Sequence, residues 1–261
     1  MDARAFYDGL GYDYDLMVSW KDRLGREAAF FDRMLQEAGA ASVLDAACGT
    51  GMHAAMFAGK GLRTAAADLS PEMVAMAKQN AKVADVQVDV RAAAFGELSK
   101  VFTDTFDLVV CLGNSLPHLL DDQALDSALA DFARVLTPSG MLVIQNRNYD
   151  RVLRDSSRFM PLAARADGVE ETLFLRITDF PRESSETVDF TIVTLKKRNG
   201  VWTQSPRSTT LRALRRKTLE RALGRCGFGR VRVWGGYDMS PFDEGLSADL
   251  LVAATRADLT R

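Results

Sequence analysis

The chain has 261 residues, of which 47% are hydrophobic and 26% are charged, and its formal net charge is -2. This length suits one α/β domain with an insertion better than two equal domains. A nearly neutral chain has no overall attraction to nucleic acid or to an anionic membrane, so we expect neither as a partner. The absence of a basic-then-apolar leader and of an apolar run of about 18 residues predicts a cytoplasmic protein.

The cysteines and the basic residues carry no signature of a metal site or a docking surface. Cys48, Cys111 and Cys226 have neither CxxC nor paired Cys/His spacing, so we expect no disulfide framework and no metal. Arginine and lysine side chains crowd residues 212–221. At helical spacing such a cluster is usually a solvated face, and we interpret it in this way.

From about residue 42 to 147, short apolar runs alternate with helical patterns, which is typical of βαβ units around a parallel sheet. Strands are expected at 42–45, 62–68, 86–90, 106–112 and 141–145. Helices are expected after Gly51, from Ser70 with Pro71 in the first turn, and over 122–136 before a turn at 138–140.

After Tyr149 the pattern changes to longer strands of mixed period. Strands at 171–180 and 187–197, with a turn at Gly200, predict an inserted antiparallel sheet. The α/β pattern then resumes with a helix at 216–226 and strands at 231–234 and 250–254. The first 40 residues are expected to be helical and to lie outside the sheet. The fold class is therefore α/β, a Rossmann-like sheet with helices on both faces and an inserted antiparallel lid.

The first motif is the run Asp-Ala-Ala-Cys-Gly-Thr-Gly from Asp45 to Gly51, at the end of the first expected strand. Glycines in such a turn let a ligand approach the backbone closely, and amides at the next helix N-terminus favour anionic groups. The acid ahead of the glycines would repel a pyrophosphate but can attract an ammonium, such as that of a methionine moiety. Two alternatives stay open, a dinucleotide pattern completed by Ala54 and a plain strand–turn–helix.

Further polar residues follow three other strands. Asp68 ends the second strand, where a carboxylate can accept both ribose hydroxyls of an adenosine cofactor; its alternative role is a helix cap. Asn114 and Ser115 follow the fourth strand and should face the reacting groups, although an asparagine there is often only a turn residue. Arg147 follows the fifth strand, where a guanidinium can hold a carboxylate with two parallel hydrogen bonds, although such an arginine is often a surface residue.

Three segments together resemble the glycine N-methyltransferase family, which includes the glycine/sarcosine methyltransferases. They are Asp45 to Gly51, the Cys-Leu-Gly-Asn-Ser run of 111–115 with His118, and the Gln-Asn-Arg-Asn-Tyr-Asp run of 145–150. The first is shared by nearly all class I methyltransferases that use S-adenosyl-L-methionine (SAM), and the other two are narrower. The resemblance covers about residues 7–155. It implies SAM as cofactor and S-adenosyl-L-homocysteine as product.

Carried over position by position, the resemblance implies roles for individual residues. Asn114 and Arg147 would be the catalytic and substrate-binding residues, with Arg147 gripping an amino-acid carboxylate, and Tyr14 would also contact the substrate. Arg26 would pair with the methionine carboxylate. The full set implied to bind the cofactor is Trp20, Arg26, Asp45, Ala47, Gly49, Gly51, Asp68, Leu69, Ala94, Phe95, Leu112 and His118.

The chain also departs from that family in two places. Ala93 and Ala94 stand where the family has an acid or amide followed by tryptophan, so adenine recognition must come from the backbone or from Phe95. The insertion is poor in tyrosine, which predicts a more apolar acceptor pocket. We expect a division into an N-terminal lid (1–40), a SAM-binding domain (41–150 and 212–261) and an inserted substrate lid (151–211).

The expected activity is transfer of a methyl group from SAM to the amine of a small carboxylate-bearing molecule such as glycine or sarcosine. Two rivals remain: an O- or C-methyltransferase of a small natural-product intermediate, and a catalytically silent SAM-binding protein. The sequence leaves open the acceptor, the number of methyl groups transferred, a dedicated base, and whether the chain is a monomer or a homo-oligomer.

Overall fold

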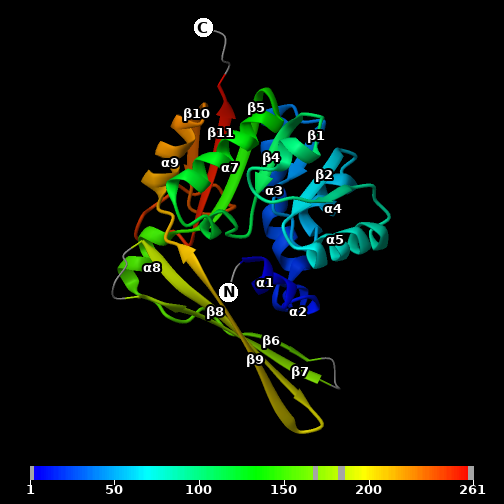
Figure 1. The fold of residues 1–261 in the computed structure, drawn as a ribbon, viewed down its shortest axis with the longest axis vertical. Coiled ribbons are helices and arrows are strands. Elements are labelled where there is room, and N and C mark those ends of the chain that lie inside the picture. Colours follow the sequence, from blue (N-terminus) through cyan, green and yellow to red (C-terminus); the bar gives the residue numbers. More distant parts are fainter. Residues whose placement is uncertain (1–2, 167–169, 182–185, 258–261) are drawn as a thin grey trace.

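The computed structural model describes residues 3–166, 170–181 and 186–257. It contains a seven-stranded sheet and a separate four-stranded antiparallel sheet. The antiparallel sheet extends as an arm from the body that holds the larger sheet (Figure 1). The predicted α/β fold with an added antiparallel sheet is confirmed. Within the described part of the chain, no helix is both long and apolar enough to span a bilayer.

The larger sheet is parallel except at one edge. In spatial order its strands are β10 (Phe228–Trp234), β11 (Asp249–Arg256), β5 (Leu136–Arg147), β4 (Phe106–Cys111), β1 (Ser42–Asp45), β2 (Arg63–Asp68) and β3 (Asp89–Ala92). β11 alone runs in the opposite direction to the other strands of this sheet, so its pairs with β10 and β5 are antiparallel. Because the other strands are parallel, the loops after β1, β2, β4 and β5 meet at one edge.

Three predicted boundaries were wrong by three residues or more, and one is the start of β10, at Phe228 instead of 231. The third strand begins at Asp89, three residues later than expected, because α5 and its turn occupy the preceding chain. The turn expected at 138–140 is an irregularity inside β5 instead. Leu136 pairs with Phe106 and Met141 pairs with Leu108, so β5 has extra residues relative to β4 at this point.

Ten helical segments connect the strands in the described residues. They are α1 (Ala3–Asp8), α2 (Tyr12–Met17), α3 (Trp20–Ala38), α4 (Met52–Gly59), α5 (Pro71–Val83), α6 (Leu98–Val101), η1 (Leu116–His118), α7 (Asp122–Val135), α8 (Tyr149–Asp155) and α9 (Arg216–Arg225). The predicted cap of α5 is confirmed, since Ser70 Oγ accepts a hydrogen bond from Met73 N at 3.1 Å. The short helix α8 was not predicted.

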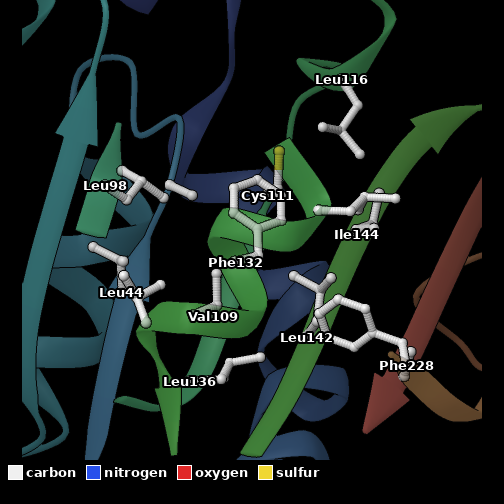
Figure 2. Close-up of a cluster of buried hydrophobic side chains, with 14 of the residues drawn as sticks. Leu44, Leu98, Val109, Cys111, Leu116, Phe132, Leu136, Leu142, Ile144 and Phe228 are labelled. Carbon is white, nitrogen blue, oxygen red and sulfur yellow. The ribbon is translucent and has the colours of Figure 1, made fainter. Parts of the chain in front are cut away.

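The sheet is buried on both faces because successive strand residues point to opposite sides. On one face, Val109 and Cys111 of β4 pack with Phe132 of α7, and α6 and α9 complete this layer (Figure 2). On the other face, Leu108 and Val110 pack with the aromatic side chains of α3 and with α4. Of the first 40 residues, α3 thus belongs to the core layer.

The second sheet contains β6 (Ala163–Ala166), β7 (Glu170–Asp179), β8 (Thr187–Arg198) and β9 (Val201–Arg212). Asn199 and Gly200 both have positive φ, as a two-residue hairpin requires. The inner face of this sheet packs Phe174 and Ile192 against Phe6 of α1. Helices α1 and α2 therefore lie between the two sheets (Figure 1).

Replacing Gly51 by alanine is expected to destabilise the protein by about 2–4 kcal/mol, the sum of backbone strain and overpacking. Gly51 has φ 77°, and a Cβ there would lie 2.7 Å from the Cβ of Ala77. Urea denaturation measures the free energy of unfolding. Gly224→Ala on α9 is the matched control, because no heavy atom lies within 4 Å of its added Cβ. Equal stability of the two variants would contradict the prediction.

Candidate active site

Two cavities open at the edge where the parallel strands end. The smaller, of about 230 Å³, lies against the loops after β1, β2 and β4. The larger, of about 1080 Å³, lies between the ends of β4 and β5, the inner face of the antiparallel sheet, and the loop before β11. Five residues line both cavities: Tyr7, Tyr14, Arg23, Gly113 and His118. The cavities therefore adjoin at this point.

Asp68 is held in place by backbone amides on the wall of the smaller cavity. Its Oδ2 accepts from Gly49 N at 2.8 Å and its Oδ1 accepts from Ser70 N at 2.9 Å. A carboxylate oxygen can accept two hydrogen bonds, so each oxygen keeps one free position. Burial raises the pKa of Asp68. The arrangement suits two adjacent hydroxyl donors, as on a ribose.

Asp45 lies behind the cavity wall rather than in it. Its carboxyl group is buried, and neither oxygen has a hydrogen-bond partner among the described residues. Burial, together with the nearby negative charge of Asp68, raises the pKa of Asp45 to about 7. A positive charge bound in front of this wall would therefore be stabilised by the field of Asp45 without direct contact.

The structure brings most of the predicted cofactor residues together. Those that line the smaller cavity are Trp20, Ala47, Gly49, Asp68, Leu69, Ala94, Phe95, Leu112 and His118. Asp45 and Gly51 line neither cavity. Gly51 is needed for its positive φ and for the close approach of Ala77, so its place in the motif reflects packing.

Arg26 is not placed at the cofactor cavity. It is exposed and lines only the larger cavity, whereas Arg23, three residues earlier on α3, lines both. Arg23 Nε donates to Glu27 Oε1 at 2.8 Å, and Glu27 Oε2 lies 2.6 Å from His53 Nε2. Burial and the Glu27 contact fix the guanidinium of Arg23. The i,i+4 spacing of Arg23 and Glu27 is a signal in the sequence that could have pointed to Arg23.

The N-terminal helices are fastened over the smaller cavity. Asp15 Oδ1 accepts from Trp20 Nε1 and from Thr50 Oγ1, both at 2.6 Å. The Tyr7 hydroxyl lies 3.2 Å from His118 Nε2. These contacts join α1, α2 and the start of α3 to the glycine loop and to the end of β4, so the cavity is covered.

Asn114 follows β4 in a left-handed conformation, with φ 66°. Its Oδ1 accepts from Arg147 N at 3.0 Å, and its Nδ2 donates to the Tyr149 hydroxyl at 3.0 Å. Asn114 lines the larger cavity, but much of its hydrogen-bonding capacity is spent on the end of β5. Its side chain thus positions Arg147 and Tyr149.

Four arginines line the larger cavity: Arg23 and Arg26 of α3, Arg147 of β5 and Arg176 of β7. Arg147 ends β5, and its Nη1 donates to Thr178 Oγ1 of β7 at 3.4 Å. Arg176 of β7 was missed from the sequence, because nothing in a strand pattern shows which residue faces a distant loop. Burial and the charge of Arg147 lower the pKa of Arg176. Tyr7 of α1 and Arg23 of α3 were also missed, because a helical pattern alone does not show which residue faces a distant cavity.

A methyltransferase domain model matches residues 43–140. The whole fold is similar to that of a SAM-dependent methyltransferase from Clostridium acetobutylicum, with a TM-score of 0.76, 17% identity and 97% of each chain covered. Residues 43–140 therefore form a methyltransferase domain. The CcbJ methyltransferase of Streptomyces caelestis also has a similar fold, with a TM-score of 0.78, 20% identity, and 99% of this chain and 100% of that chain covered.

Curated relatives of the methyltransferase domain resemble about half of the chain. A glycine/sarcosine N-methyltransferase of Parasynechococcus marenigrum is 40% identical over 144 residues, 55% of this chain and 51% of the relative. The glycine N-methyltransferase of Rattus norvegicus is 34% identical over 145 residues, 51% of this chain and 49% of the relative. The chain spans about half the length of the curated relatives it matches.

SAM is the cofactor of this class of domain, and the smaller cavity of the methyltransferase domain fits it. Asp68 offers two free acceptor positions for the ribose hydroxyls. The buried carboxyl of Asp45 has no hydrogen-bond partner among the described residues, and the ammonium of a methionine moiety would supply a positive charge near it. Arg23 lies where the two cavities adjoin and is suited to the methionine carboxylate.

Proposed function

We propose that the chain transfers a methyl group from SAM to the amine of a small, carboxylate-bearing molecule. The observation that carries the proposal is Arg147, which lines the larger cavity and has no acidic group within ion-pair distance among the described residues. A guanidinium in such a position is suited to a carboxylate ligand. The similarity to glycine/sarcosine N-methyltransferases supports an amine as the acceptor.

The proposed chemistry is in-line displacement at the junction of the two cavities. Bound SAM supplies a methyl group that its sulfonium has already activated. The contribution of the chain is then alignment, for which pre-organisation can supply up to roughly 7–11 kcal/mol. Arg147 would hold the acceptor by its carboxylate, while Tyr7 and Tyr14 enclose the junction and exclude water.

We also propose roles for the three expected parts of the chain. Residues 41–150 and 212–261 would bind SAM, and residues 151–211 would close the acceptor side. Within 1–40, the segment before α3 would act as the movable lid, since polar contacts such as those of Asp15 fasten it to the glycine loop.

The acceptor should reach the site as a neutral amine. Burial lowers the pKa of His118 to about 4, so this imidazole is too weak a base to deprotonate an ammonium group with a pKa of about 8–10. We expect log kcat/KM to rise with pH, with a slope of about one, up to the pKa of the acceptor amine. His118→Gln should keep this slope. If kcat/KM of the His118→Gln variant did not change with pH over the same range, the prediction would be contradicted and His118 would be the base.

Cofactor binding should release a proton near pH 6. The pKa of Asp45 is about 7, against 3.8 for an unperturbed group, so the carboxyl is mainly protonated at this pH before binding. The positive charge of bound SAM favours the carboxylate, and up to about one proton leaves. Calorimetry in two buffers of different ionisation enthalpy measures the release. It should vanish in Asp45→Asn, and equal heats for the native chain in both buffers would contradict the prediction.

The proposed function is tested by measuring S-adenosyl-L-homocysteine formation with amines, phenols and carboxylic acids. Turnover of carboxylate-bearing amines alone is the expected result. Turnover of phenols or carbon acids without amines would favour the O- or C-methyltransferase. Tight SAM binding with no turnover across the panel would favour a silent SAM-binding protein.

A further inference from the structure

Of the four arginines that line the larger cavity, Arg147 and Arg176 lie at a defined place relative to each other. Arg176 and Thr178 are two residues apart on β7, so their side chains leave the same face of the sheet at Cα positions about 7 Å apart. Thr178 is the residue that accepts from Arg147. Arg176 Nη2 donates to Pro161 O at 2.9 Å, while its Nε is buried without a partner among the described residues.

The acidic side chains around the cavity are already engaged. Glu27 is paired with Arg23, and Asp249 Oδ1 accepts from Gln145 Nε2 at 2.9 Å. The remaining acids accept from backbone amides of their own turns: Asp238 and Asp243. In the described residues, neither Arg147 nor Arg176 has a carboxylate within ion-pair distance, although Asp249 lies opposite Arg147 on β11. Two adjacent, partly buried cations repel each other, and each is best stabilised by an anion of its own.

The size and the lining of the larger cavity point to an acceptor larger than glycine. Its volume is about 1080 Å³. Cavities of roughly 300–1,000 Å³ hold drug-sized ligands. Ile192 lies opposite Arg176 on the neighbouring strand, and Phe190 lies opposite Thr178. Both apolar side chains line the cavity, so the path between the two arginines passes over aliphatic and aromatic surface.

We infer that the acceptor is a dicarboxylic amino acid whose α-carboxylate binds Arg147 and whose second carboxylate binds Arg176. The methylene groups between the two acids would lie against Phe190 and Ile192. This inference rests on the proposed function and makes its substrate class narrower. It also gives the antiparallel sheet a direct part in choosing the acceptor.

The first test compares three acceptors of similar length in the native chain: L-glutamate, L-glutamine and L-norvaline. Glutamate carries the second charge, glutamine replaces it with an amide, and norvaline removes the polar group. We expect kcat/KM for glutamate to exceed both others by at least about 10-fold, as the loss of one charge-assisted hydrogen bond implies. Equal or better turnover of norvaline would show that size rather than charge is selected and would overturn the inference.

The second test uses Arg176→Met, with Arg158→Met as the matched control. Arg158 is exposed, pairs with Asp179 of the same sheet and lines neither cavity. Arg176→Met should lower kcat/KM for glutamate about 30- to 100-fold and that for glycine less than about 3-fold. Arg176→Lys should recover part of the glutamate activity, which separates charge from folding. The control should leave both acceptors unchanged.

Two outcomes distinguish the inference from the proposed function. If Arg176→Met lowers turnover of glycine and glutamate equally while cofactor affinity is kept, both arginines grip one carboxylate, and the inference alone is overturned. If the native chain methylates no amine at all, the proposed function fails and the inference fails with it.

Discussion

Arg147→Met is expected to lower kcat/KM for a carboxylate-bearing amine by roughly 100- to 1,000-fold, because removing one partner of a hydrogen-bonded charge pair costs roughly 2–5 kcal/mol. Arg147 ends β5, and Asn114 fixes its backbone amide. Among the described residues, its guanidinium donates only to Thr178, at 3.4 Å, so most of its donors remain for a ligand. The assay is steady-state formation of S-adenosyl-L-homocysteine.

The effect should be confined to the acceptor. Arg147 does not line the smaller cavity, so the Kd for S-adenosyl-L-homocysteine should change by less than about 2-fold. Sites that share no contacts act nearly independently. An amine without a carboxylate should be methylated equally well by the native chain and the variant. If the variant loses activity toward both amines to the same extent, Arg147 does not bind the acceptor carboxylate.

Asp68→Ala is expected to weaken binding of S-adenosyl-L-homocysteine by about 100-fold or more, since two hydrogen bonds to a charged acceptor are lost at once. The substitution also leaves Gly49 N and Ser70 N without their acceptor, which loosens the loop that shapes the cavity. Isothermal calorimetry measures the Kd, and thermal unfolding shows whether the fold is retained.

The control for Asp68 is Asp104→Ala, which removes an exposed carboxylate that pairs only with Arg63 in the described residues. The Kd of Asp104→Ala for S-adenosyl-L-homocysteine should equal that of the native chain. Asp68→Asn keeps one carbonyl acceptor and should bind with intermediate affinity. Native affinity in Asp68→Ala would mean that the ribose is held elsewhere and would contradict the proposed cofactor site.

Features that depend on neighbouring residues were predictable from the sequence. The stripe of α7, the Ser70 cap of α5 and the hairpin at Gly200 all follow from patterns a few residues long. The strand–loop–helix that contains Asp45 and Gly51 is equally local. In these segments, side-chain periodicity and backbone preference act over one or two turns, so the residues of a segment are enough to predict its structure.

The failures share a different origin. The bulge in β5 depends on pairing with β4, and α3 joins the core because its aromatic residues, Phe30 and Phe31 among them, meet the far side of the sheet. No local pattern states which distant strand will be the partner. Such contacts are decided by the packing of complete elements.

The site divides in the same way. Local patterns were enough to predict a methyl-donor half, because Gly49 and Asp68 follow strands whose ends must meet at one edge of a parallel sheet. The packing of distant elements, in contrast, brings Arg23 rather than Arg26 to the smaller cavity and places Arg176 near Arg147. Those choices depend on how a helix is rotated against the sheet and how a second sheet is docked. Both result from the burial of surfaces that lie far apart in the chain.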